Sequence, residues 1–433
     1  MSNKVNTFNP NSPVNPGMFV GRIDETNRLE QALIQTRAGN PGHFMLTGER
    51  GIGKSSLLLW LKYAAEGRVA INGERLKFLI VDGDVDNETT QNGLVKRIQL
   101  ALDRQLGVTE AAKSFLSDSW KFLQRVRVME TGLEQAPEKA QSDEVMLDEF
   151  AFSLGNIAKR TAEASETSMF SAKYDGILIL IDEADNCSGI LNLGSFLKLL
   201  LERLQRADCT RVLVGLAGLP NLRNRLHTSH PSALRIFEEL ALSRLSDDEV
   251  SRVIDSCLNK ANEQNEQKTS VDEAARKLLI SFSEGYPHFI QQFGYSAFAA
   301  DTDGVITQAD FVQGAFGERG ALELIGNRYY RDDFYNKIQS DGARQVLRIM
   351  ADDLDGWVTK QKIAAKFKGK ETILTNALKT LRDRKIILDK EGTRGTYRLQ
   401  HKGFALWIKL NTKAQAESGT GESPKPAASE SGG

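Results

Sequence analysis

Residues 48–55 read GERGIGKS, and this stretch decides the fold. It follows the apolar run HFMLT at 43–47 and precedes SLLLWLKYAA at 56–65, a segment with the apolar content of a packed helix. The spacing G-x-x-x-x-G-K-S between a strand and a helix is typical of a phosphate-binding loop, whose glycines let backbone amides and the helix N-terminus face phosphate groups. The stretch therefore predicts an ATP site, whose candidate contacts are Gly48, Glu49, Arg50, Gly51, Ile52, Gly53, Lys54, Ser55 and Ser56.

Two residues of this loop have distinct expected roles. Lys54 is expected to neutralise the β and γ oxygens of the nucleotide, and the hydroxyl of Ser55 to bind Mg²⁺. A chance match to the bare pattern is the alternative, and the position of the loop between a strand and a helix disfavours it.

A second motif, ILILIDE at 177–183, places two carboxylates at the end of an apolar strand. A buried acid without a partner costs several kcal/mol, and a metal ion would offset that cost. Asp182 is therefore predicted to hold Mg²⁺ through water, and Glu183 to polarise the water that attacks the γ-phosphate. A strand that simply ends in solvated acids is the alternative, and the nearby phosphate-binding pattern disfavours it.

Apolar runs alternate with helix-period segments through the first half of the chain. The runs lie near residues 44, 76, 177 and 211, with a fifth strand expected shortly after 235. They are apolar at successive positions, as are parallel strands covered by helices on both faces. From Ser246 onward, apolar residues recur at helix spacing behind Ser or Asp caps. These patterns predict an α/β fold, with a parallel sheet core and a helical lid.

The predicted boundaries divide the chain into five segments. An extended lead-in at 1–17 precedes the core at 18–245, which contains a polar helical insertion at 107–142, and the lid follows at 246–333. A basic unit occupies 334–413, and the small polar residues at 414–433 predict a disordered tail.

The overall composition is that of a globular protein, with 26% charged and 40% hydrophobic residues. No apolar run reaches the roughly 18 residues of a membrane span, and the N-terminus lacks the pattern of a signal peptide. Three well-separated cysteines, Cys187, Cys209 and Cys257, suit core thiols in a reducing compartment. The five histidines are scattered, which disfavours zinc. We therefore expect a cytoplasmic protein without a membrane partner.

A near-neutral net charge of −1 conceals a basic C-terminal segment. Residues 356–413 carry fifteen Lys or Arg against four acids, a net charge of +11, whereas the first 355 residues sum to about −10. Residues 334–410 read as three helices followed by a hairpin, whose Gly392 and Gly395 permit a tight turn. This order predicts a winged-helix domain, and its charge favours duplex DNA as a partner.

The candidate DNA contacts lie mainly on the third helix and at the tip of the ribbon. Thr372, Thr375, Asn376 and Lys379 are expected on the face that enters a major groove, and Lys390 and Arg394 on backbone phosphate. Lys360, Arg382 and Arg398 are further phosphate candidates. The alternative is a regulatory module that contacts a protein, because lysines are also common on solvated faces.

Four patterns in order resemble one family: FVGRIDE at 19, GERGIGKS at 48, ILILIDE at 177 and GYP at 285. They look like the AAA+ ATPases close to replication initiators of the origin-recognition type and to the related STAND signalling ATPases. The resemblance covers about residues 18–330, and a C-terminal winged helix is shared by those groups. It implies a P-loop ATPase core with a helical lid.

The resemblance implies further nucleotide contacts outside the loop. Val20, Gly21 and Arg22, flanked by Phe19 and Glu25, would pack over the adenine, and Pro287 would lie beside the base. Read from the residues alone, the first box is a helix entry with an Arg–Glu pair, and GYP is a turn between helices. The fourth strand, VLVGLAGLP at 212–220, departs from the family because it offers no polar sensor side chain, which implies slow hydrolysis.

Arg235 precedes the expected fifth strand. By the same resemblance it would reach the γ-phosphate of a neighbouring subunit and couple hydrolysis to assembly into a homo-oligomer. A surface arginine that ends a helix is the alternative, and Arg223, Arg225 and Arg244 are weaker candidates for the role.

Two functions remain open from the sequence. The first is a nucleotide-switched ATPase that binds DNA through its winged helix. The second is a STAND-like regulatory ATPase of a signalling or antiviral module, whose winged helix contacts an effector protein. A metabolic kinase is disfavoured because the basic unit offers nothing to a small acceptor.

Overall fold

The computed structural model describes residues 4–14, 18–123, 136–165, 169–170, 172–353, 356–390 and 392–417. These divide into two compact units. The first, which we call the sheet unit, contains residues 9–257 and 286–288, and the second, the helical unit, contains 1–8, 258–285 and 289–433. Residues 124–135 of the predicted insertion and residues 418–433 of the predicted tail lie outside the described residues. None of the described helices is both long and apolar enough to cross a membrane.

The sheet unit is built on five parallel strands in the order β2-β3-β4-β1-β5. The strands are β1 (Phe44–Thr47), β2 (Phe78–Asp84), β3 (Gly176–Asp182), β4 (Val212–Gly218) and β5 (Glu238–Ala241). All five begin where the sequence predicted, so the parallel α/β core is confirmed. Gly215 lies beside Phe44 in the register, and a Cβ there would stand 2.1 Å from the Phe44 ring, so only glycine fits.

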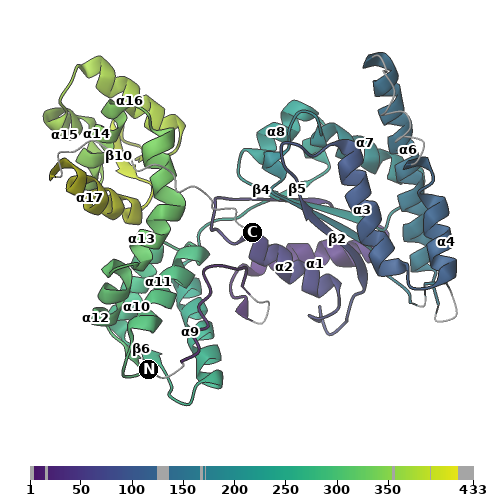
Figure 1. Cartoon of the computed structure of the whole chain (residues 1–433), viewed down its shortest axis with the longest axis horizontal. Helices are drawn as coiled ribbons and strands as arrows, with labels where there is room; N and C mark the ends of the chain where they lie inside the picture. Colours follow the sequence, from purple (N-terminus) through teal and green to yellow (C-terminus); the bar gives the residue numbers. More distant parts are fainter. Residues whose placement is uncertain are drawn as a thin grey trace, which may run out of the picture. The chain divides into compact units, whose positions relative to one another are not determined.

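Helices cover both faces of this sheet, as Figure 1 shows: α1 and α2 lie on one side, and α7 and α8 on the other. Side chains alternate between the two faces of β3. Ile177, Ile179 and Ile181 point to one face, where they join a buried cluster with Leu197 and Leu200 of α7, and the residues between them face the other layer of helices. The helices of this layer arrangement are α1 (Ile23–Arg37), α2 (Lys54–Ala65), α3 (Gln91–Leu106), α4 (Glu110–Ser119), α6 (Ala136–Ala162), η2 (Ala184–Asn186), α7 (Leu193–Arg206), α8 (Leu222–Ser229) and η3 (Ala233–Arg235).

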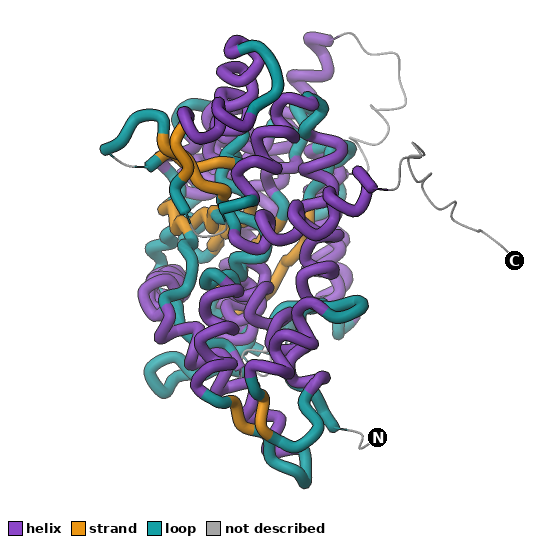
Figure 2. The backbone as a smooth tube through the Cα atoms, turned by 90° about the vertical axis from the view of Figure 1, so that its left-hand side faces the viewer, coloured by secondary structure: helices purple, strands orange, loops and turns teal. Residues whose placement is uncertain are grey.

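The helical unit begins with residues 4–8, which are anchored by specific contacts. Lys4 forms an ion pair with the buried carboxylate of Asp301, and the Phe8 ring lies against Gly294. Asp272 caps α10, as the predicted Asp caps require. Figure 2 shows the short strands of the chain in orange among its helices. The elements here are α9 (Asp247–Gln264), which begins in the sheet unit, β6 (Ser270–Val271), α10 (Glu273–Ser283), α11 (Pro287–Ala300), β7 (Val305–Ile306), α12 (Gln308–Phe316) and α13 (Ala321–Ile325).

Two π-helical turns, η4 (Gly326–Tyr330) and η5 (Asp333–Lys337), lead into the C-terminal part of the helical unit. Its elements are α14 (Asp341–Ala351), β8 (Val358–Thr359), α15 (Lys360–Lys366), α16 (Glu371–Asp383), β9 (Ile387–Asp389), β10 (Thr396–Leu399) and α17 (Lys402–Glu417). The three strands pair in the order β8-β10-β9. The predicted three helices and hairpin are present. The sequence analysis did not foresee β8, which is only two residues long, or α17.

Candidate functional site

The phosphate loop at 48–55 makes a tight turn between β1 and α2. Gly51 and Gly53 have φ values of 77° and 100°, a region in which side chains other than glycine are strained. Helix α2 begins at Lys54, directly after Gly53. The N-terminus of this helix and the loop amides therefore form the kind of site that attracts phosphate.

Lys54 lies folded over the loop that contains it. Its Nζ donates hydrogen bonds to the carbonyl oxygens of Gly48 at 2.7 Å and Glu49 at 3.0 Å. Burial lowers the pKa of Lys54, and the carboxylates of Asp182 and Asp185 oppose that shift. The ammonium is thus held at the mouth of the loop, within reach of an incoming phosphate.

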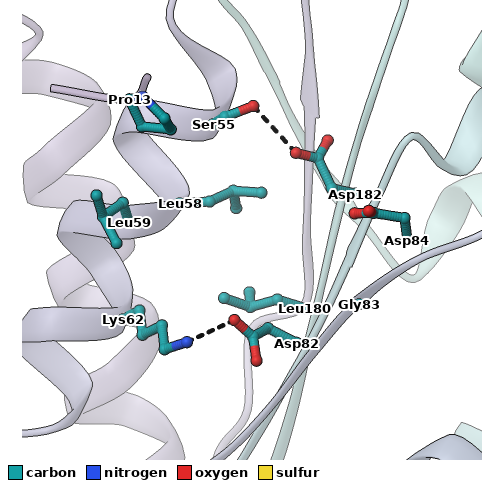
Figure 3. A pocket seen from close by; sticks show the side chains of 10 residues that line it. All are labelled: Pro13, Ser55, Leu58, Leu59, Lys62, Asp82, Gly83, Asp84, Leu180 and Asp182. Carbon is teal, nitrogen blue, oxygen red and sulfur yellow. Dashed lines mark hydrogen bonds and ion pairs between the residues drawn. The ribbon is translucent and has the colours of Figure 1, made fainter. Parts of the chain in front are cut away.

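Ser55 and Asp182 meet where the sequence placed the metal. The Ser55 hydroxyl donates to Asp182 Oδ2 at 3.1 Å, which joins the start of α2 to the end of β3 (Figure 3). Both side chains line a cavity of about 320 Å³, which extends to Lys62 and Asp82. A hydroxyl and a carboxylate are the hard oxygen ligands that Mg²⁺ prefers, so the pair fits the predicted ion.

Glu183 follows Asp182 in a left-handed conformation with φ of 50°, and the residue is exposed. Asn186 Nδ2 donates to Glu183 Oε2 at 3.0 Å, and the Glu183 amide donates to Asp182 Oδ1 at 2.8 Å. Asn186 therefore holds the carboxylate of the predicted base, and Asp182 holds its backbone amide. Asn186 was not foreseen, although its place three residues after Glu183 on a short helical turn is a usable signal.

Asp185 is a buried carboxylate that the sequence analysis also missed. Its Oδ1 accepts the backbone N–H of Leu219 at 2.9 Å, and a Cβ on Gly218 would stand 2.7 Å from that oxygen. The structure thus brings a carboxylate to the end of β4, where the strand offers no polar side chain of its own. That carboxylate is already bonded to the backbone.

Arg22 connects the loop to the end of the sheet. It is 5% exposed, and its Nη2 donates to the carbonyl oxygens of Ile52 at 2.8 Å and Ser243 at 2.7 Å. Its Nη1 donates to Glu25 at 3.1 Å, so the Arg–Glu pair is present. Neighbouring Gly21 has φ of 84°, and Val20 is half-buried. The role of these residues at an adenine stays a prediction.

Residues 286–288 contact three alternate positions of the phosphate loop. The Tyr286 hydroxyl donates to Glu49, and the His288 amide donates to the Gly51 carbonyl at 3.1 Å. Pro287 lies 3.5 Å from the point that a Cβ on Gly53 would occupy. The structure therefore places Pro287 at the loop, and it adds Tyr286 and His288, which the sequence analysis did not single out.

The four arginine candidates have different surroundings. Arg223 forms an ion pair with Glu239, Arg225 donates to the Cys187 carbonyl at 2.9 Å, and the Arg244 guanidinium lies 4.7 Å from the Tyr286 ring. Arg235 is exposed at the end of η3, and within the described part of the chain its side chain makes no hydrogen bond or ion pair.

The predicted DNA contacts are exposed except for Lys360, which is half-buried, and some of them have partners within the protein. Thr372, Thr375, Asn376 and Lys379 lie on the exposed face of α16, opposite its buried Leu374 and Leu378. Lys390 and Arg394 are exposed in the turn between β9 and β10. Lys360 Nζ lies 3.4 Å from Glu371, and Arg382 donates to Asp389 at 2.8 Å. The Trp357 ring lies 5.0 Å from the Arg398 guanidinium and 6.0 Å from Lys390 Nζ.

Comparison with known proteins covers this site directly, because the family model described as the AAA ATPase domain matches residues 18–227. Residues 18–227 of the chain are therefore similar to this domain. The match includes the phosphate loop, β3 with its acidic end, and α8. The resemblance of the sequence to AAA+ ATPases is confirmed over these residues, which include the loop at 48–55. The binding of phosphate by that loop stays a prediction.

Several solved structures are similar to the chain as a whole. The ADP form of the ORC2 protein of Aeropyrum pernix is 14% identical with a TM-score of 0.45, covering 96% of this chain and 98% of that chain. The Cdc6p protein of Pyrobaculum aerophilum is 13% identical with a TM-score of 0.41, covering 95% and 98% respectively. The ORC1 protein of Aeropyrum pernix in complex with DNA is 15% identical with a TM-score of 0.38, covering 92% and 94%. The comparison with curated proteins found no match.

Proposed function

We propose that the protein is a cytoplasmic switch ATPase that binds ATP with Mg²⁺, hydrolyses it slowly, and binds duplex DNA through its C-terminal basic segment. One observation carries the ATPase half of this proposal. Within the residues matched by the AAA ATPase family model, the Ser55 hydroxyl bonds to Asp182 at the end of β3, Lys54 precedes Ser55 in the loop, and Glu183 follows Asp182 directly.

Each of these side chains has a task that its position supports. Lys54 would exchange the carbonyls of Gly48 and Glu49 for the β and γ oxygens of ATP, so its charge is used where negative charge concentrates. Glu183, held by Asn186, would orient and polarise the attacking water. Ser55, with Asp182 through water, would hold Mg²⁺, which supplies charge neutralisation when bound. The hydrolysis experiment for Glu183 is argued in the Discussion.

Slow turnover is part of the proposal. The end of β4 presents only apolar residues, and the one carboxylate that reaches it, Asp185, is engaged with the Leu219 amide. A second polar group to position the water opposite Glu183 is therefore missing from the described residues of this strand end. Since positioning contributes strongly to such reactions, we expect a low kcat.

Assembly supplies a further part of the proposed mechanism. Among the four arginine candidates, Arg235 alone has a side chain without a bonded partner in the described residues, and it is exposed. A guanidinium with these properties can reach an acceptor on a neighbouring subunit, and the γ-phosphate is a suitable acceptor. ATP would thereby control the assembly of a homo-oligomer.

Arg235→Ala should leave the ATP affinity of the monomer nearly unchanged, because the residue lies outside its own loop. It should remove any rise of specific ATPase activity with protein concentration, since that rise reports an arginine supplied by a neighbour. Turnover measured across a hundredfold range of protein concentration tests this. The control is Arg28→Ala, an exposed arginine paired with Glu238. If the wild type and Arg235→Ala both show activity independent of concentration, Arg235 has no such role.

The DNA half of the proposal interprets residues 334–413 as a winged helix. Three observations support it: the net charge of +11 at 356–413, the exposed polar face of α16, and the ribbon β9–β10 with exposed Lys390 and Arg394. A helix that exposes Thr372, Thr375, Asn376 and Lys379 at spacings of three and four residues can face a major groove. The ribbon cations would then meet backbone phosphates.

The salt dependence of DNA binding tests this interpretation. If four exposed cations of this segment, Lys379, Lys390, Arg394 and Arg398, meet phosphates, log K should fall against log salt with a slope of about −3.6. Arg394→Ala should reduce the slope by about one unit and weaken all sequences alike. Fluorescence anisotropy with a labelled duplex measures both effects. Lys277→Ala, a solvated cation paired with Glu273 on α10, is the control.

The full chain is the right material for this experiment. Deletion of residues 334–413 would remove Trp407, whose ring lies against Gly326, and Phe404, whose ring centroid is 5.0 Å from that of Tyr330. Point substitutions avoid exposing this aromatic cluster. A slope near zero in the wild type would exclude the DNA proposal and would favour an effector protein as the partner of the basic segment.

A further inference from the structure

Three side chains in contact, those of Glu49, Tyr286 and Arg244, have no role in the mechanism proposed above. The Tyr286 hydroxyl donates to the Glu49 carboxylate, and the Arg244 guanidinium lies 4.7 Å from the Tyr286 ring and also bonds to the hydroxyl. Tyr286 is 1% exposed. A buried phenol that serves only as core filling could be phenylalanine, so the hydroxyl has a task.

The Tyr286 hydroxyl stays a donor at neutral pH. Burial raises the pKa of Tyr286, and the hydrogen bond to Glu49 raises it further. The phenol is therefore protonated under all physiological conditions. The hydroxyl can therefore donate its hydrogen bond to Glu49 whether or not nucleotide is present.

Glu49 occupies a sensitive place in the loop. Its carbonyl accepts from Lys54 Nζ at 3.0 Å, and Lys54 is the residue that serves the β and γ oxygens. Glu49 thus lies at the end of the loop where the γ-phosphate would bind. A carboxylate free to turn toward that phosphate would repel it, and the repulsion would be stronger for ATP than for ADP because ATP carries the additional charged group.

We infer that Tyr286 is a positioning residue, which holds the Glu49 carboxylate away from the phosphate site and thereby preserves the preference of the loop for ATP over ADP. Two further contacts fix the segment that carries it. The His288 amide bonds to the Gly51 carbonyl at 3.1 Å, and Pro287 packs against Gly53. The contacts of Tyr286, Pro287 and His288 fall on alternate residues of the loop. They fix the position of the tyrosine relative to the loop. This inference rests on the proposed binding of ATP at the loop.

Tyr286→Phe should weaken ATP binding by roughly tenfold, the size expected when one hydrogen bond to a charged group is lost. ADP binding should change by less than about twofold, since ADP lacks the group that meets Glu49. Isothermal titration calorimetry of both nucleotides with Mg²⁺ measures the two effects. A loss that is equal for ATP and ADP would overturn the inference, because that is the result of general loosening of the loop.

Two substitutions at Glu49 separate charge from packing. Glu49→Gln removes the charge, so adding Tyr286→Phe to it should cost ATP affinity less than about twofold. Glu49→Asp keeps the charge but shortens the side chain by one methylene group, so it should reproduce the selective loss of ATP with the tyrosine in place. This variant also decides the question if Tyr286→Phe fails to fold. Failure of Glu49→Gln to suppress the effect would contradict the inference.

The matched control is Tyr397→Phe in the helical unit. Tyr397 is also buried, and the Arg382 guanidinium lies 6.0 Å from its ring, so the substitution removes a comparable phenol far along the chain from the loop. It should change neither nucleotide affinity. If the wild type itself binds no ATP, the proposed function fails; if it does and Tyr286→Phe leaves the ATP to ADP ratio unchanged, only this inference fails.

Discussion

Lys54→Ala should reduce the affinity for ATP by on the order of a hundredfold or more, the largest effect on binding of any single substitution in the loop. The ammonium already lies over the loop, where it bonds to the carbonyls of Gly48 and Glu49. On binding it exchanges these neutral acceptors for phosphate oxygens. Bonds between charged partners are about twice as strong as neutral ones, and two or more would be lost.

Isothermal titration calorimetry with Mg²⁺ and ATP measures this loss, and thermal unfolding checks that the fold survives. The fold is expected to remain intact because Lys54 bonds to loop carbonyls and is not part of the apolar core. Helix α2 retains its buried Leu57, Trp60 and Leu61. Lys198→Ala on α7 is the matched control, a partly exposed lysine paired with Glu202 in the same unit. Unchanged ATP binding in Lys54→Ala would remove the assignment of the phosphate loop.

The strands and the loop could be predicted because their signals are local. An apolar run such as ILILID needs burial on both faces, and the glycines of GERGIGKS are required by the positive φ of Gly51 and Gly53. Each signal sits within a window of about ten residues. The strand order β2-β3-β4-β1-β5 is not local in this sense, because it depends on which helices cross which face.

The contacts that the sequence did not reveal share a different property: their two partners are distant in sequence. Tyr286 and Glu49 are 237 positions apart, and Arg22 and the Ser243 carbonyl are 221 apart. The box at 19–25 indicated the pair of Arg22 with Glu25, but it did not reveal the two backbone carbonyls to which the guanidinium also bonds. A residue type signals that a polar group needs a partner, but only the tertiary fold shows which partner it has.

The same limit explains why Asp185 escaped notice. The fourth strand looked bare because its own residues are apolar, whereas the carboxylate at its end comes from the turn after β3. Strands β3 and β4 are neighbours in the sheet, so their ends share one environment. Polar groups at a strand end must therefore be counted over adjacent strands, and the sequence does not identify which strands are adjacent.

Glu183→Gln should bind ATP normally and hydrolyse it at least about a hundredfold more slowly. General base assistance of this kind contributes roughly 10² to 10⁴ in rate, and the amide keeps the shape of the side chain while losing its charge. The Asn186 bond can persist, because the amide oxygen of glutamine still accepts from Nδ2. The left-handed turn at residue 183 is likewise retained, so only the chemistry of the carboxylate is removed.

A single-turnover assay with enzyme in excess over ATP isolates the chemical step from product release and from changes in affinity. Glu238→Gln is the matched control, an exposed glutamate at the start of β5, which lies beside the start of β1, whereas the loop follows the end of β1. It should hydrolyse ATP at the rate of the wild type. If Glu183→Gln did so as well, the base would have to be sought elsewhere, and Asp185 at the end of β4 would be the next carboxylate to substitute, since it lies close enough to Lys54 to affect its pKa.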